Sequence, residues 1–215
     1  MRIAFSRERE SRRLSEASIE TLLTEVSDGS ESAFEALIRR STDGLLRWAV
    51  RYLGDLEEAR DVVQRTFIRV WTRRRRYNPS RGAKAWLFRI ATNLAIDRLR
   101  QRQRETQRDE RVRQLQLAVP TAGDQGGSLR WSHRETAKIF RELAGCLSPR
   151  QRAAFLLREV EGLSSSEVAE ILGSRPSTVR NQIAQARSVL RRELARRYPE
   201  YLPPNDLSAE ADDPI

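Results

Sequence analysis

The 215-residue sequence contains one cysteine, one histidine and one methionine. The single cysteine, Cys146, excludes an internal disulfide and a cysteine-rich zinc site. The single histidine, His133, has no nucleophile and acid placed around it in a catalytic pattern. No apolar run approaches the ~18 residues of a membrane-spanning helix, and residues 1–30 lack the apolar core of a signal peptide. These shortages predict a protein of the reducing cytoplasm with no membrane insertion, metal or cofactor.

Lysine is also scarce, because Lys84 and Lys138 are the only two among 40 cationic residues. The remaining cations are arginines, and with 30 acidic residues the formal net charge is +10. Arginine presents a rigid fork of donors that grips phosphate with two hydrogen bonds and stacks on bases. GC-rich coding can also favour arginine, but it does not explain clusters such as Arg73–Arg76. The charge therefore predicts a polyanionic partner.

Apolar residues recur at helical spacing along most of the chain. Ile19, Leu22, Leu23 and Val26 follow the i, i+3, i+4, i+7 pattern, and similar stripes predict helices over 34–53, 55–75 and 83–104. No stretch alternates with the period of a strand. The sequence predicts an all-α protein of two helical domains joined by a flexible linker, the second domain containing a helix-turn-helix. The expected segments are a mobile extension (1–14), a helical domain (15–104), a linker (105–129), a second helical domain (130–198) and an acidic disordered tail (199–215).

The second domain contains two capping boxes and a glycine turn. Ser148 with Gln151, and Ser164 with Glu167, have the spacing in which each residue caps the other's backbone. A short helix over 165–172, a turn at Gly173 and a helix starting at Pro176 then form a helix-turn-helix pattern. An ordinary helical hairpin with a polar face is the alternative. The polar face of the last helix predicts DNA contacts by Ser177, Thr178, Arg180, Asn181, Gln182, Gln185 and Arg187.

The helix over 83–104 has a second, polar stripe beside its apolar one. Arg89, Asn93, Asp97, Arg100 and Arg104 follow at i+3 and i+4 spacing. A mostly cationic stripe next to a basic loop suits the backbone of a single DNA strand. Trp86 at the start of this helix is either a core residue or a stacking platform.

Several motifs carry a specific resemblance. Asp61–Trp71 (DVVQRTFIRVW) and Trp86–Arg100 (WLFRIATNLAIDRLR) resemble region two of bacterial RNA polymerase sigma factors of the extracytoplasmic-function (ECF) class of the sigma-70 family. LSPRQR at 147–152 and EVAEILG at 167–173 are similar to region four. The resemblance covers roughly residues 16–104 and 130–197. It implies a promoter-specificity subunit with no enzymatic activity of its own.

The resemblance also implies partners and residues. The partners are core RNA polymerase (through its β′ clamp and β flap), promoter DNA and an anti-sigma factor. Core-polymerase contacts are expected from Asp61, Gln64, Arg65, Ile68 and Arg69. Contacts with the −10 element are expected from Tyr77, Asn78, Ser80, Arg81, Arg89, Asn93, Asp97 and Arg100. The −35 element would be read by the residues already named on the last helix.

Two other functions fit parts of the sequence. A stand-alone helix-turn-helix regulator would explain the second domain, but it has no need of the motifs at 61–71 and 86–100. A metal-dependent enzyme would need clustered acids, and Asp55, Glu57, Glu58 and Asp61 are dense enough to consider. Both DNA-facing surfaces are basic, so we also expect an acidic element, such as the tail, to screen them in the free protein.

Overall fold

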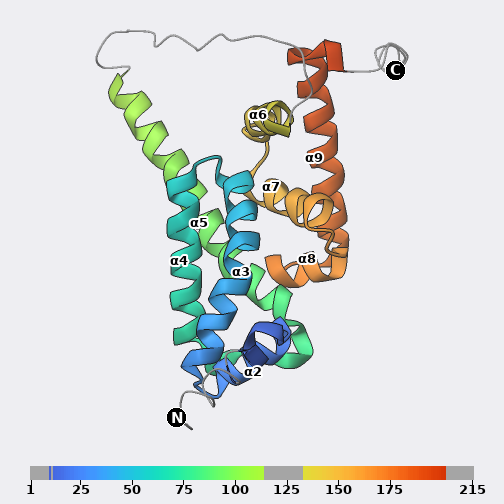
Figure 1. Cartoon of the computed structure of the whole chain (residues 1–215). Helices are drawn as coiled ribbons and strands as arrows, with labels where there is room; N and C mark the ends of the chain where they lie inside the picture. Colours follow the sequence, from blue (N-terminus) through green and yellow to red (C-terminus); the bar gives the residue numbers. More distant parts are fainter. Residues whose placement is uncertain (1–9, 11, 114–132, 202–215) are drawn as a thin grey trace.

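The computed structural model describes residues 10, 12–113 and 133–201, and every regular element within them is helical (Figure 1). This confirms the predicted all-α class. The α-helices are α2 (Ile19–Ser27), α3 (Glu31–Leu53), α4 (Leu56–Thr72), α5 (Ala83–Arg113), α6 (His133–Ala144), α7 (Pro149–Phe155), α8 (Ser165–Leu172) and α9 (Pro176–Arg197). Short 3₁₀ turns cover Arg74–Arg76 (η1), Pro79–Arg81 (η2) and Pro199–Tyr201 (η4), and a π-helical turn covers Leu156–Val160 (η3).

Local capping sets the boundaries of the N-terminal helices. The side chains of Ser18, Ser30 and Asp55 accept hydrogen bonds from backbone N–H groups at the starts of α2, α3 and α4. Such caps satisfy donors that have no partner inside the helix. Gly54 ends α3 with a left-handed φ of 79°, a conformation that glycine adopts without steric cost.

The core of the N-terminal bundle is formed where α3, α4 and α5 meet. Trp48 stacks on Tyr52 at 5.3 Å between ring centroids and meets Phe88 edge-on at 5.9 Å. Glu58 of α4 accepts hydrogen bonds from Arg98 (2.9 Å) and Arg102 (3.2 Å) of α5. These contacts fix the position of α4 relative to α5.

Helix α5 is longer than the sequence predicted. It continues to Arg113, into the range 105–129 expected to be linker. The sequence gives no break at Arg104, since Gln, Arg and Glu are all good helix formers. The rest of that linker, most of the predicted extension and all but the first residues of the predicted tail lie outside the described residues.

The C-terminal helices form around both predicted capping boxes. Ser148 caps α7 and Ser164 caps α8, with Gln151 and Glu167 returning a bond to the cap backbone. Gly173 (φ 60°) then makes the left-handed turn into α9. The cap of α9 is Arg175, whose side chain makes no capping bond.

The π-helical turn decides which residues of this segment face the core. Val160 is 42% exposed, while Leu157 is fully buried. A π-helical turn holds more residues than an α-helical turn, so it rotates the residues that follow it around the helix axis.

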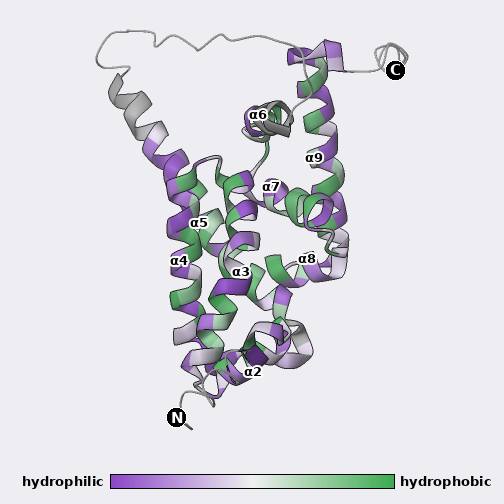
Figure 2. Ribbon diagram, in the orientation of Figure 1, coloured by the Kyte–Doolittle hydropathy of each residue, from purple (hydrophilic) through white to green (hydrophobic). Residues whose placement is uncertain are grey.

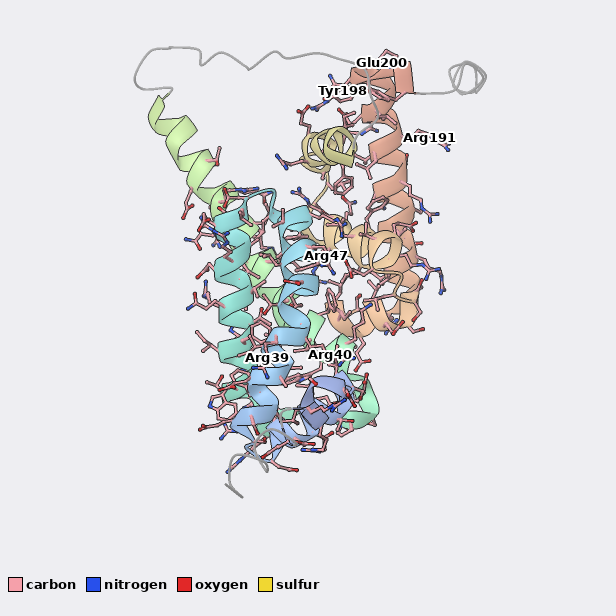
Figure 3. All side chains as sticks on the ribbon, in the orientation of Figure 1. Arg39, Arg40, Arg47, Arg191, Tyr198 and Glu200 are labelled. Carbon is pink, nitrogen blue, oxygen red and sulfur yellow. The ribbon has the colours of Figure 1, made fainter. Side chains whose placement is uncertain are left out.

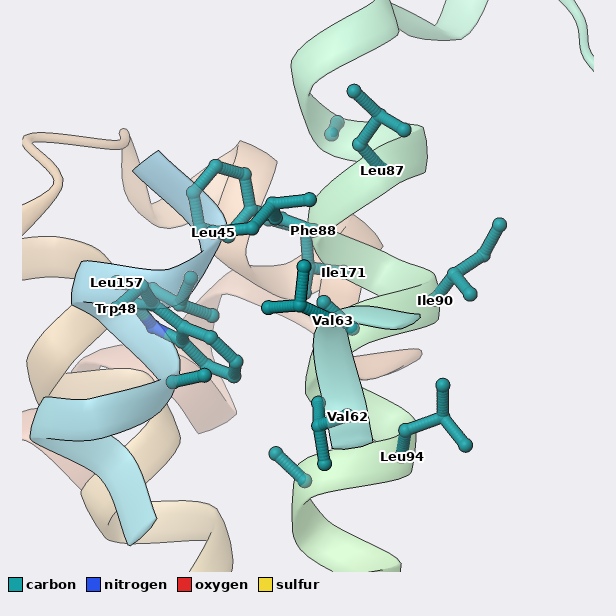
Figure 4. Packing of buried hydrophobic residues seen from close by; sticks show 14 of the residues in the cluster. Leu45, Trp48, Val62, Val63, Leu87, Phe88, Ile90, Leu94, Leu157 and Ile171 are labelled. Atoms are coloured by element: carbon teal, nitrogen blue, oxygen red, sulfur yellow. The ribbon is translucent and has the colours of Figure 1, made fainter. Parts of the chain in front are cut away.

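The two helical parts of the chain pack against each other. Helix α8 lies beside the first half of α5, and α7 approaches the end of α3 (Figure 1). Leu157 and Ile171 join the same apolar cluster as Trp48 and Phe88 (Figure 4). The Tyr52 hydroxyl donates a 3.0 Å hydrogen bond to the Pro149 carbonyl. The described chain therefore has one continuous core, and hydrophobic and hydrophilic residues alternate along its helices (Figure 2).

Candidate nucleic-acid interface

Helices α3 and α4 form an apolar groove on the surface of the N-terminal bundle. Its volume is about 520 Å³. Phe34 packs on Trp71 with ring centroids 4.9 Å apart and meets Phe67 edge-on at 6.5 Å. The full lining is Phe34, Ile38, Thr42, Leu46, Arg60, Val63, Gln64, Phe67, Ile68, Trp71 and Thr72.

The predicted core-polymerase residues divide around this groove. Gln64 and Ile68 line it, and Ile68 is 55% exposed. Asp61 and Arg65 are exposed on the same helix and pair at 3.4 Å. Arg69 lines a different pocket, on another side of α4.

Sequence reasoning missed the α3 half of the groove. The sequence predicts one apolar stripe for the helix over 34–53, yet Phe34 and Ile38 on that stripe are only half-buried. The signal was present: Phe34, Ile38, Thr42 and Leu46 repeat at i+4, beside the buried stripe of α3. Two adjacent apolar stripes on one helix indicate that it meets two partners.

A cationic pocket lies where α4, the 77–82 loop and α5 meet. Its volume is about 300 Å³. The lining contains four arginines, a tryptophan and two asparagines, with one acidic residue. It consists of Arg69, Arg73, Arg76, Asn78, Ala85, Trp86, Arg89, Ile90, Asn93 and Glu170.

Short-range hydrogen bonds shape the loop at the edge of this pocket. The Asn78 Oδ1 atom accepts bonds from the Ser80 N–H (3.0 Å) and hydroxyl (2.8 Å), which starts the η2 turn. Gly82 follows with φ 73° and brings the chain into α5. This Asx-type turn places the loop without help from a ligand.

Tyr77 supports the pocket from beneath. It is 8% exposed and packs edge-on against Trp86, with ring centroids 5.4 Å apart. Burial raises the pKa of the Tyr77 phenol. Trp86 is half-buried, so one part of its ring belongs to the core and another lines the pocket.

The predicted −10 residues do not all reach the pocket. Asn78, Arg89 and Asn93 line it. Tyr77 lies beneath it, and Ser80 is exposed in the turn. Asp97 and Arg100 are exposed farther along α5, and the Arg81 side chain lies outside the described residues.

Most of the pocket lining was absent from the predicted −10 set, including the three arginines Arg69, Arg73 and Arg76 and the aromatic Trp86. The sequence shows the arginines as a basic cluster before the 77–82 loop. It leaves open whether Trp86 is a core residue or a stacking platform. Only the fold brings the end of α4 against the start of α5.

The third candidate surface is the outer face of α9. Ser177, Thr178, Arg180 and Asn181 are exposed at its N-terminal end, and Gln182 is half-buried. Gln185 accepts a hydrogen bond from Gln151 (3.1 Å). Arg187 pairs with Glu159 at 2.7 Å. Arg191 points away from the rest of the molecule farther along the helix (Figure 3).

The described residues hold neither a cluster of metal ligands nor a membrane-spanning helix. Within them, no three His, Cys, Asp or Glu side chains gather as metal ligands would. No helix among residues 10, 12–113 and 133–201 combines the length and apolarity needed to cross a membrane.

Comparison with known families matches both helical parts. Residues 37–105 match Sigma-70 region 2, and residues 137–190 match Sigma-70, region 4. The first match includes the α3–α4 groove and the cationic pocket, and the second includes the helix-turn-helix. A stand-alone regulator is not favoured, because the first match gives the N-terminal part a sigma-factor assignment of its own.

Individual relatives agree with these matches. ECF RNA polymerase sigma factor SigE of Mycolicibacterium smegmatis is 35% identical over 76% of this chain and 62% of its own length. RNA polymerase sigma factor CnrH of Cupriavidus metallidurans is 32% identical over 79% of this chain and 90% of its own. The chain thus spans less than two thirds of the first relative and most of the second.

Solved structures show the same fold. CnrH in complex with the cytosolic domain of CnrY has a TM-score of 0.62 and 25% identity, covering 83% of this chain and 97% of that chain. The sigma factor RpoE of Bartonella quintana, in complex with the anti-sigma factor NepR, has a TM-score of 0.57 and 24% identity, covering 75% of this chain and 96% of that one. On these sequence and family matches, the chain belongs to the ECF class of sigma-70 family RNA polymerase sigma factors.

Proposed function

We propose that three surfaces of this chain divide the work of promoter recognition. The α3–α4 groove, with Asp61, Gln64, Arg65 and Ile68 at its α4 side, binds core RNA polymerase. The cationic pocket holds the melted strand of the −10 element. The start of α9 reads the −35 element in duplex DNA.

One observation carries this proposal: α4 separates an apolar groove from a cationic pocket. An apolar groove with an exposed Ile68 suits a protein partner, since interface cores are apolar and poor in charge. A pocket lined by four arginines and a tryptophan suits a base with its flanking phosphates, because arginine neutralises phosphate and an aromatic ring stacks on a base. Binding both partners through one rigid helix would hold the DNA strand at a fixed position on polymerase.

The proposed −35 contacts follow from which α9 side chains are available. Arg180 and Asn181 are exposed on the first turns, where a helix-turn-helix protein presents side chains to base edges. Gln185 and Arg187 are engaged by Gln151 and Glu159, so they would have to exchange those partners for DNA. We therefore assign base reading to Arg180 and Asn181 first.

The protein partner can be tested with two exposed apolar residues on α4. Ile68 (55% exposed) lines the groove, whereas Leu56 (44% exposed), near the start of the helix, does not. Ile68→Ser should weaken binding to purified core RNA polymerase by about tenfold, as loss of a central interface side chain does. The measurement is a titration of labelled protein with core enzyme.

Leu56→Ser is the matched control and should leave the affinity within about twofold, as peripheral contacts do. Thermal unfolding of both variants should match the wild type, because neither side chain is buried. Equal losses of affinity in both variants, or none in either, would contradict the assignment of the groove.

The family resemblance extends the proposal to regulation and location. The relative CnrH was solved with the cytosolic domain of a second protein, CnrY. We infer that a protein of the anti-sigma kind also binds this chain and competes with polymerase. The chain would act in the cytoplasm, where core polymerase is found, and would contribute binding and positioning rather than catalysis.

A further inference from the structure

One residue of the cationic pocket comes from the other end of the chain. Glu170 of α8 is half-buried and lines the pocket together with Arg69, Arg73, Arg76 and Arg89. It is the only acidic residue of that lining. The Glu170 carboxylate therefore occupies part of the pocket that, under the proposed function, binds a base and a phosphate of the −10 strand. Its negative charge repels that phosphate.

Polar contacts also hold Glu161, at the end of η3, against the N-terminal bundle. Lys84 Nζ, at the start of α5, donates a 3.3 Å hydrogen bond to the Glu161 carbonyl. The Glu161 side chain lies 3.9 Å from the Arg51 guanidinium at the end of α3. Acidic and carbonyl groups of the C-terminal part thus meet basic groups of the N-terminal part.

Apolar packing supports the same arrangement. Ile171, next to Glu170 in sequence, is 1% exposed and belongs to the cluster that contains Phe88 of α5 (Figure 4). Because Ile171 is buried on this side, α8 cannot move away from the pocket without exposing it. Occupation of the pocket edge by Glu170 and burial of Ile171 therefore occur together.

The interface also contains an uncompensated charge. Arg152 of α7 is 4% exposed, and its Nε atom has no hydrogen-bond partner. The interaction that the structure gives its guanidinium is with the Tyr52 ring, 5.7 Å away. A buried cation without an acid costs free energy, so this interface is weaker than its apolar contacts alone would make it.

We propose that α8, through Glu170, is an internal competitor for the −10 strand. In the free chain the C-terminal helices close the edge of the cationic pocket, and the strand gains full access when α8 leaves α5. This inference rests on the proposed role of the pocket. The acidic element expected from the sequence is then a residue of the helix-turn-helix itself, in addition to any effect of the tail.

The test measures binding of a fluorescein-labelled, mixed-sequence single-stranded DNA oligonucleotide to the free full-length chain. Glu170→Gln should tighten binding by about threefold or more at low salt, since it removes a like charge from the phosphate site. Glu200→Gln removes the same charge from η4, at the far end of α9 (Figure 3). This control should change the dissociation constant by less than about 1.5-fold, because Glu200 does not line the pocket.

A second measurement does not depend on the Glu170 variant. Donor and acceptor dyes on Thr72→Cys and Ser188→Cys, in a Cys146→Ser background, report the separation of α4 and α9. Saturating oligonucleotide should lower the energy transfer as α8 leaves α5. Unchanged transfer at saturation, or equal affinities for wild type and Glu170→Gln, would overturn the inference.

A different experiment distinguishes failure of the proposed function from failure of this inference. If the pocket does not bind the −10 strand, Arg89→Ala leaves promoter-dependent transcription by the reconstituted holoenzyme unchanged. If Arg89→Ala abolishes transcription while Glu170→Gln binds DNA as the wild type does, the pocket assignment stands and the competitor role of α8 is wrong.

Discussion

Arg152 is a buried charged side chain whose Nε atom has no hydrogen-bond partner. Burial, together with the nearby charges of Arg102 and Arg141, lowers the pKa of its guanidinium to about 10. Among the described residues no carboxylate pairs with it. The same burial raises the pKa of the facing Tyr52 phenol. The contact between Arg152 and Tyr52 therefore lies between the two helical parts of the chain but lowers the stability of their interface.

This cost can be measured by replacing the charge with an apolar chain of similar length. Arg152→Met should raise the free energy of unfolding by about 1 kcal/mol, because removal of an unpaired buried charge outweighs loss of one cation–π contact. Urea unfolding followed by circular dichroism gives the difference. Arg150→Met, at an exposed position two residues earlier, should change stability by less than about 0.5 kcal/mol. A destabilised Arg152→Met variant would mean that the guanidinium is a net favourable part of the interface.

At the scale of single elements, α8 depends on its capping box. Glu167 accepts a 2.8 Å hydrogen bond from the Ser164 N–H, and this bond lowers the pKa of the Glu167 carboxyl from its ordinary value. A carboxyl whose pKa is lowered by folding stabilises the folded state at pH values above its unfolded pKa. That contribution is lost as the pH falls through the folded value.

The pH dependence of stability should reveal this cap. The free energy of unfolding of the wild type should exceed that of Glu167→Ala by about 1 kcal/mol at pH 7, and the difference should shrink as the pH falls through the lowered pKa of the carboxyl. Denaturant unfolding at several pH values between 3 and 7 measures it. Glu167→Gln, which keeps an acceptor but no charge, should show a smaller pH dependence than the wild type. A difference that stays constant down to pH 3 would assign the effect to helix propensity instead.

The same scale shows what the sequence can and cannot predict. The capping residues, the turn at Gly173 and the polar face of α9 follow from local rules, and each lies where the sequence placed it. The π-helical turn at Leu156–Val160 does not follow from local rules. It depends on the surrounding packing, and no residue type in that segment indicates a π-helix. The end of α5 was also missed, since polar helix formers have the same composition as a solvated linker.

At the scale of the whole molecule, the largest departure from the sequence reading is the packing of the two helical parts. The sequence indicated two helical domains on a tether, because residues 105–129 have the length and polar composition of a flexible linker. Only the fold shows that Leu157 and Ile171 complete the core around Trp48 and Phe88. The same contact brings Glu170 to a pocket formed by residues about 70 to 100 positions earlier in the chain. Contacts at such sequence separation leave no periodic signal in a single sequence.

The sigma-factor assignment itself was accessible from the sequence, since the motifs at 61–71 and 86–100 lie within the segment that matches Sigma-70 region 2. The division of roles along α4 was not. Arg69 and Ile68 are neighbours in sequence, yet one lines the cationic pocket and the other the apolar groove. Their separation depends on the direction in which each side chain leaves the helix.

A sigma factor directs core RNA polymerase to promoters. Run-off transcription with purified core enzyme on fragments of genomic DNA tests this role of the chain most directly. We predict transcripts that require the protein and whose start sites share two upstream sequence blocks, and that disappear with Ile68→Ser but persist with Leu56→Ser. Tight binding of the protein alone to duplex promoter DNA, with no protein-dependent transcript from core enzyme, would contradict the account.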